Sequence, residues 1–127
     1  MPRKSKTATA GPSQRQLRVG EDLRHHLSSI LMRQETHIPE LDTVPITVSE
    51  VSVSPDLSNA RVYVMTLGGV EIERVLPVLN QTAPLLRHQL ASRVHLRRLP
   101  TLKFVADESY ETADRMAKLF SSIQTDN

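Results

Sequence analysis

Cysteine is absent from this chain of 127 residues, and aromatic residues make up only 3% of it. Without cysteine the protein has no disulfide framework and no Cys-ligated zinc site, which fits a reducing compartment. No apolar run approaches the roughly 18–20 residues that span a bilayer. Residues 1–16 also lack the apolar middle of a secretory signal. We therefore expect a cytoplasmic protein without a membrane segment.

Carboxylates are missing from two stretches of the chain, although its overall charge is only +2. Positive charge without acidic neighbours within about 8–10 Å keeps its field, which is typical of surfaces that meet phosphates. The pattern favours nucleic-acid binding over an ordinary solvated surface. Residues 1–18 contain Arg3, Lys4, Lys6, Arg15 and Arg18. Residues 74–106 contain Arg74, Arg87, Arg93, Arg97, Arg98 and Lys103, together with His88 and His95.

Arginine supplies twelve of the sixteen Lys and Arg residues. Its planar guanidinium can bind a phosphate through two parallel hydrogen bonds, which an ammonium group cannot match. Base stacking needs exposed aromatic rings, and the chain offers few of them. We therefore expect recognition of RNA shape and phosphates rather than of single-stranded bases. The available rings are Tyr63, Phe104, Tyr110 and Phe120.

A helix that begins near Gln16 is predicted by an apolar stripe at helical spacing. Residues 44–53 are rich in β-branched side chains, and a change of phase near residues 49–50 predicts a bulged strand. A second strand over residues 60–67 completes a hairpin. In the intervening turn we expect Asp56 to bond to the turn's own backbone. The stripe of the first helix consists of Val19, Leu23, Leu27, Ile30 and Leu31.

Two more helices and a third strand are predicted in the rest of the chain. The first helix spans residues 70–81, and Pro77 should distort or shorten it. Pro84 suits the first turn of the second helix, because its missing N–H costs nothing there. In that helix Leu86, Leu90 and Val94 should face the sheet, and after Pro100 an alternating pattern predicts a strand. The strand positions are Leu102, Phe104 and Ala106. One face of a final weak helix would carry Ala113, Met116, Ala117 and Phe120.

These elements predict an α+β fold in the order helix, strand, strand, helix, helix, strand. The three strands form a mixed sheet with helices on one face, and the order is that of type II KH domains. We assign residues 1–14 to a disordered basic tail and residues 15–108 to the KH-like RNA-binding domain. Residues 109–127 would form the weak C-terminal helix and a tail.

The histidine and carboxylate residues do not form a pattern that favours a metal site or an enzyme active site. His25 and His26 point about 100° apart on a helix, so they cannot easily share a metal ion. The acidic groups lie at predicted helix starts, where carboxylates favour the helix dipole rather than converging on a nuclease metal. We expect no catalysis, metal, cofactor or small-molecule substrate. The acidic residues in question are Glu71, Glu73, Asp107, Glu108 and Glu111.

Two segments carry a more specific signal than the topology does. Residues 51–64 read VSVSPDLSNARVYV, and residues 79–104 read LNQTAPLLRHQLASRVHLRRLPTLKF. Together they closely resemble the ribosome-binding factor A family, through its SPDL-x-x-A-x-V-Y-V and L-R-x-x-L-A…L-R-x-x-P-x-L-x-F signatures. Asp107 and Ser109 match a D-x-S element that follows, and the resemblance covers residues 15–120.

The resemblance implies a KH-like factor that binds the free small (30S) ribosomal subunit and contacts 16S ribosomal RNA. It implies help with late subunit assembly and with 16S rRNA processing, most needed during growth in the cold. The family is a binding factor and not an enzyme. Its basic signature positions fall on Arg87, Arg93, Arg97 and Arg98, its structural proline on Pro100, and its strand residues on Leu102 and Phe104.

One family feature differs in this chain. KH domains that grip single strands use a GXXG loop, and glycines at positions 11, 20, 68 and 69 cannot form one. The family has instead a helix kink of Ala-x-Gly type, which aligns with Thr82, Ala83 and Pro84. Because proline clashes with the carbonyl four residues earlier, we predict a sharp bend here and two helices rather than one.

We predict that a monomer binds RNA through its basic residues. An alternative partner is an acidic protein, to which the chain would dock as an adaptor through the same basic residues. Both partners are recognised electrostatically, so the sequence leaves the alternative open. The predicted RNA-binding residues are Arg18, Arg61, Arg87, Arg93, His95, Arg97, Arg98 and Lys103.

Overall fold

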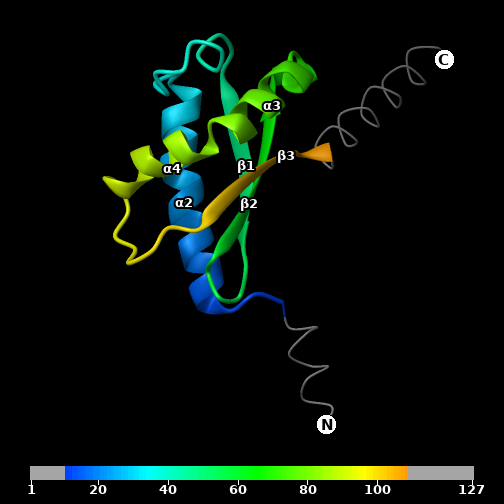
Figure 1. The fold of residues 1–127 in the computed structure, drawn as a ribbon. Helices are drawn as coiled ribbons and strands as arrows, with labels where there is room; N and C mark the ends of the chain where they lie inside the picture. The colour runs from blue at the N-terminus through cyan, green and yellow to red at the C-terminus, as the bar shows by residue number, and fades with distance from the viewer. Residues whose placement is uncertain (1–10, 109–127) are drawn as a thin grey trace, which may run out of the picture.

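The computed structural model describes residues 11–108, in which helices and a three-stranded sheet pack around one core (Figure 1). Residues 1–10 of the expected basic tail and the weak helix expected after residue 108 lie outside the described residues. Within residues 11–108, no helix is long and apolar enough to cross a membrane. The elements are α2 (Gln14–Met32), β1 (Ile46–Val53), β2 (Asn59–Thr66), a 3₁₀ turn (Leu67–Gly69), α3 (Ile72–Gln81), α4 (Ala83–Ala91) and β3 (Thr101–Ala106).

Helix α2 begins earlier than the sequence pattern indicated. Ser13 is its N-cap, and a capping box joins the Ser13 side chain to the Gln16 backbone N–H at 3.1 Å and the Gln16 side chain to the Ser13 N–H at 2.8 Å. The assignment of residues 13 and 14 to a tail is therefore wrong. The predicted apolar stripe is confirmed, since all five of its members are buried.

The sheet has the order β1-β2-β3, with β1 antiparallel and β3 parallel to β2. The predicted bulge is confirmed by a register shift between Val48 and Glu50. Buried and exposed residues alternate along each strand, so Val62 and Phe104 point into the core while Arg61 points the other way. One face of the sheet packs on the helices, and we call the other its open face.

The turn between β1 and β2 is held by Asp56, as predicted. Its Oδ1 accepts hydrogen bonds from the Ser58 N–H at 3.1 Å, the Ser58 hydroxyl at 2.7 Å and the Ser54 hydroxyl at 2.8 Å. These bonds, with those from Ser58 first, lower the pKa of Asp56 below its usual value. Asp56 therefore has a structural role in building the hairpin.

Helices α3 and α4 are separate, with Thr82 as the cap of both, so the chain forms the predicted two helices. The Thr82 N–H and hydroxyl both donate to the Val78 carbonyl, at 2.9 and 2.6 Å. Pro84 follows in the first turn of α4. Pro77, which was expected to distort or shorten the helix, is exposed within α3, and the helix continues past it to Gln81.

Helix α4 ends at Ala91, which is earlier than the spacing of Leu86, Leu90 and Val94 suggested. The N–H groups of Arg93 and Val94 both donate to the Leu90 carbonyl, at 2.8 and 3.0 Å, and this tightened turn ends the helix. Val94 is buried nevertheless, from a position in the following loop. The element order and mixed sheet are those of a type II KH-like α+β fold, as predicted.

Candidate nucleic-acid interface

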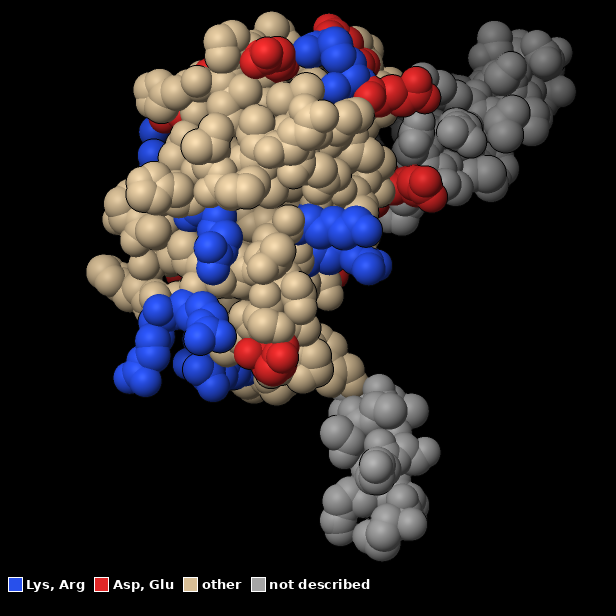
Figure 2. Space-filling model, in the orientation of Figure 1, with Lys and Arg blue, Asp and Glu red and all other residues tan. Residues whose placement is uncertain are grey.

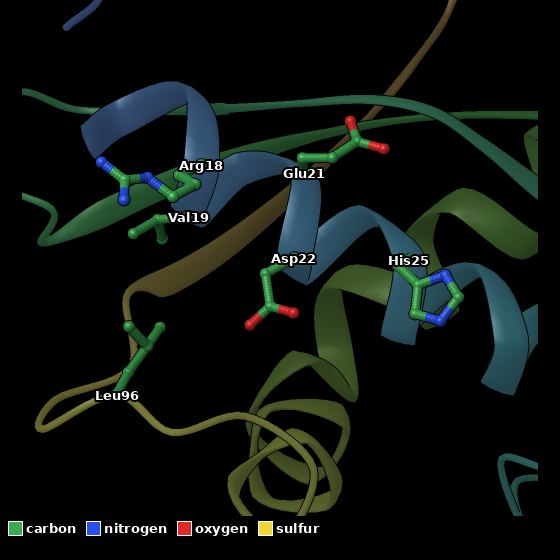
Figure 3. A pocket seen from close by; sticks show the side chains of 6 residues that line it. All are labelled: Arg18, Val19, Glu21, Asp22, His25 and Leu96. Atoms are coloured by element: carbon green, nitrogen blue, oxygen red, sulfur yellow. The ribbon is translucent and has the colours of Figure 1, made fainter. Parts of the chain in front are cut away.

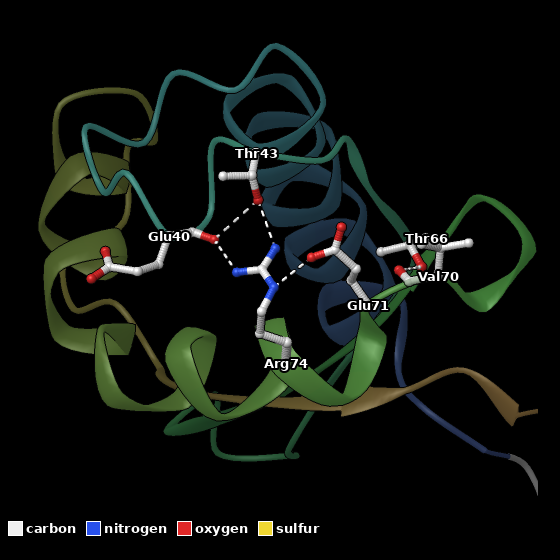
Figure 4. A network of polar contacts seen from close by, with 6 residues as sticks. All are labelled: Glu40, Thr43, Thr66, Val70, Glu71 and Arg74. Atoms are coloured by element: carbon white, nitrogen blue, oxygen red, sulfur yellow. Dashed lines mark hydrogen bonds and ion pairs between the residues drawn. The ribbon is translucent and has the colours of Figure 1, made fainter.

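Arg74, the first basic residue of the acid-free stretch, is used within the protein. Its guanidinium donates to the Glu40 carbonyl at 3.0 Å, to the Thr43 hydroxyl at 2.6 Å and to the Glu71 carboxylate at 2.5 Å (Figure 4). Nearby, Thr66 donates to the Val70 carbonyl at 2.5 Å and steadies the turn before α3. Arg74 thus fastens the loop before β1 to α3 and does not belong to a phosphate-binding surface.

Arg87 has a comparable structural task on α4. Its Nε donates to the Pro100 carbonyl at 3.0 Å and its Nη2 to the Leu99 carbonyl at 2.6 Å. The side chain is half-buried as a result. These two bonds fix the end of residues 92–100, the segment between α4 and β3 that we call the basic loop. Arg87 was predicted to contact RNA directly, whereas its geometry makes it a residue that positions the basic loop.

The basic loop exposes most of the remaining positive charge. Arg93, His95, Arg97 and Arg98 are all exposed, and none takes part in the ion pairs found within residues 11–108. Beside the loop lies a hollow of about 430 Å³, bounded by α4 on one side and by Arg97 and Arg98 on the other. Flexible guanidinium groups at the rim of a hollow can adapt to phosphates on a folded RNA.

Arg18 approaches this loop from α2, although the two are far apart in the sequence. Leu96 lines the hollow next to α4 and also a second hollow of about 580 Å³ that Arg18 helps to line (Figure 3). Glu21 and Asp22 border the second hollow, where Glu21 pairs with Arg24 and Asp22 lies 3.5 Å from His26. The hydrogen bond from Arg24 lowers the pKa of Glu21. Arg18 therefore extends the basic surface up to an acidic border.

Arg61 and Lys103 lie on a different surface from the basic loop. Both belong to exposed strand positions whose neighbours in sequence are buried, and their side chains point to the open face of the sheet. The structure therefore distributes the predicted RNA-binding residues over two surfaces. Figure 2 shows most basic side chains over the middle and lower parts of one face and most acidic ones along its upper and right edges, with one basic group among the acidic ones at the top and one acidic group among the basic ones at the bottom.

The structure also shows the surroundings of the histidines and carboxylates that were considered above as possible metal or nuclease groups. Glu71 pairs with Arg74, and the Ser49 hydroxyl donates to the Asp107 carboxylate. His25 and His26 meet edge to face, with ring centroids 5.1 Å apart. In the part of the chain that the structure describes, no three His, Asp or Glu side chains gather as a metal site would require.

Substituting Arg87 should affect folding and binding together. Arg87→Ala removes two charge-assisted hydrogen bonds, so the free energy of unfolding should fall by about 1–2 kcal/mol and the basic loop should lose its position. Arg87→Lys should be nearly as harmful, because a single ammonium cannot reproduce the fork that reaches both carbonyls. Arg98→Ala is the matched control, since it removes one charge without a described bond. Thermal unfolding of the three variants measures the difference, and equal stability of all three would contradict this role.

The sequence and fold can be compared with known proteins. A family model described as Ribosome-binding factor A matches residues 15–120. A protein of that name from Phenylobacterium zucineum is 51% identical over 110 residues, covering 87% of this chain and 76% of the relative. One from Cereibacter sphaeroides is 46% identical over 121 residues, covering 95% of this chain and 88% of the relative.

Solved structures give the same result. The crystal structure of ribosome-binding factor A from Thermus thermophilus is 32% identical, covers 72% of this chain and 94% of its own, and superposes with a TM-score of 0.60. A homology model of the Thermus thermophilus factor, fitted into a cryo-EM map of its complex with the 30S subunit, superposes with a TM-score of 0.52 at 31% identity, covering 68% and 93% of the two chains. The chain belongs to the ribosome-binding factor A family.

Proposed function

We propose that this protein binds the free small (30S) ribosomal subunit and contacts 16S rRNA there. The supporting observation is the basic loop, whose four exposed basic side chains have no described acidic partner and are joined by Arg18. A relative of known fold has been fitted into a map of its complex with the 30S subunit. Phosphate contacts from such a surface give affinity that falls steeply with salt.

The contact is best understood as recognition of shape and phosphates. Folded RNA presents its backbone oxygens in a fixed array, and guanidinium groups around a hollow can bind several of them without reading bases. The protein acts by binding and not by catalysis, as a cytoplasmic monomer without cofactor. In this role it assists late subunit assembly and 16S rRNA processing, most strongly in the cold.

Cosedimentation tests the proposal. The protein should travel with free 30S subunits and not with 70S ribosomes in a sucrose gradient at physiological salt. It should also retain binding to 16S rRNA fragments from which ribosomal proteins have been removed, because RNA phosphates are the ligand. Binding that disappears with the ribosomal proteins would favour the alternative role of an adaptor on an acidic protein.

A further inference from the structure

The open face of the sheet contains a hollow that the proposed contact does not use. It has a volume of about 1120 Å³ and is bordered by β2, β3 and the end of the β1–β2 hairpin. Arg61, Tyr63 and Lys103 line it, together with the chain at Gly11. None of the described residues that line it is Asp or Glu. The hollow therefore combines positive charge, one aromatic ring and open space.

Arg61 and Lys103 form a like-charged pair on the open face, where the nearest carboxylate of β1, Glu50, stands opposite Tyr63 rather than opposite either cation. They are direct partners in the register of the parallel strands β2 and β3, which lie about 4.8 Å apart. Like charges placed side by side on a sheet are destabilising. Neither takes part in an ion pair within residues 11–108, and Ser52 is the neighbour of Arg61 on β1. An anion bound between the two side chains would relieve their repulsion.

Tyr63 indicates what kind of anion would fit between Arg61 and Lys103. It follows Arg61 by two residues on β2, so both side chains lie on the same face, and its ring is half-buried with one part open to the hollow. A tyrosine ring next to a guanidinium provides a stacking surface beside a phosphate site, which suits a nucleotide better than an acidic peptide. The flat sheet can accept an extended strand whose bases lie against it.

We propose that the open face binds a single-stranded RNA segment, with a phosphate between Arg61 and Lys103 and a base on Tyr63. This inference rests on the proposed function only in taking RNA as the partner. The basic loop and the open face are separate surfaces, so the protein would hold two RNA segments at once. Such bridging would let a small binding factor fix the distance between two parts of an RNA that is still folding.

Binding of a fluorescent single-stranded RNA of eight nucleotides at low salt tests the inference. Arg61→Gln combined with Lys103→Gln should weaken binding about tenfold and reduce the salt slope by about 1.4, as expected for two lost contacts to a single strand. Tyr63→Ala should also weaken binding about tenfold, and Tyr63→Phe should restore it because the ring is kept. Arg97→Gln combined with Arg98→Gln removes the same charge from the basic loop and measures how much of the oligonucleotide binding depends on that loop. Amide resonances of β2 and β3 should shift when the RNA is added.

The outcomes separate this inference from the proposed function. Equal loss of oligonucleotide binding in the two double variants, or none in either, would overturn the open-face site while leaving 30S binding through the basic loop untouched. Displacement of the RNA by a poly-glutamate peptide of equal charge would assign the face to an acidic protein and also overturn it. Oligonucleotide binding that depends on Arg61, Lys103 and Tyr63 would support the inference even if the protein does not bind 30S subunits.

Discussion

Replacing Arg93, Arg97 and Arg98 together with Glu is expected to abolish binding to the 30S subunit without unfolding the protein. All three side chains are exposed on the basic loop and have no described hydrogen-bond partner, so their loss leaves no buried group unpaired. Each phosphate contact contributes about one unit to the salt dependence of binding, so the slope should fall by about three. Reversal of charge adds repulsion from the phosphates to the lost attraction.

Two controls separate charge from geometry in this variant. The same three residues changed to Lys keep the charge, so binding should be only partly reduced, through loss of the planar fork. Arg33→Glu places a negative charge at the other end of α2 and should bind nearly as the wild type does. Sedimentation with 30S subunits and circular dichroism are measured on the same samples. Full binding by the Glu variant at physiological salt would show that the basic loop is not part of the interface with the 30S subunit.

Gly20→Ala is expected to destabilise the protein, although alanine is the better helix former. Gly20 is buried where α2 crosses β1, and a Cβ added there would lie 2.6 Å from the Val51 carbonyl oxygen and 3.5 Å from a methyl of Val53. Helix propensity alone would favour alanine by about 1 kcal/mol. The clash is with backbone, which cannot rotate away, so the helix must shift at a cost of about 1–3 kcal/mol or more.

Chemical denaturation measures the net effect, and we expect the free energy of unfolding to fall. Gly20→Val should be worse than Gly20→Ala, because two more methyl groups must fit into the same contact. Arg15→Ala, at an exposed position in the first turn of α2, is the control for propensity and should leave stability nearly unchanged. A stability gain for Gly20→Ala would mean that α2 does not approach β1 so closely.

Local patterns in the sequence were sufficient for most of the fold. The apolar stripe of α2, the phase change at the bulge and the proline at the start of α4 each depend on neighbours in the chain. The earlier start of α2 was also predictable, because Ser13 and Gln16 have the spacing of a capping box. The end of α4 was not, since Val94 continues the helical spacing from a loop position that the tertiary fold buries.

The candidate site was less accessible to sequence reasoning, for two physical reasons. In the sequence, Arg74 and Arg87 cannot be told from the other arginines of the acid-free stretch. In the structure, their guanidinium groups donate hydrogen bonds to backbone carbonyls of other segments. No local pattern reveals such long-range partners. The separation of Arg61 and Lys103 did leave a signal, because each stands between two buried strand residues and alternation sends it to the opposite face.

Photo-crosslinking from the basic loop tests the central claim most directly. A photoreactive amino acid in place of His95, which is exposed in the middle of the loop, is irradiated in the complex with 30S subunits. The same residue in place of Met32, exposed at the other end of α2, is the control. We predict crosslinks from position 95 to 16S rRNA, with far fewer from position 32. Crosslinks from position 95 to ribosomal proteins alone would contradict the account.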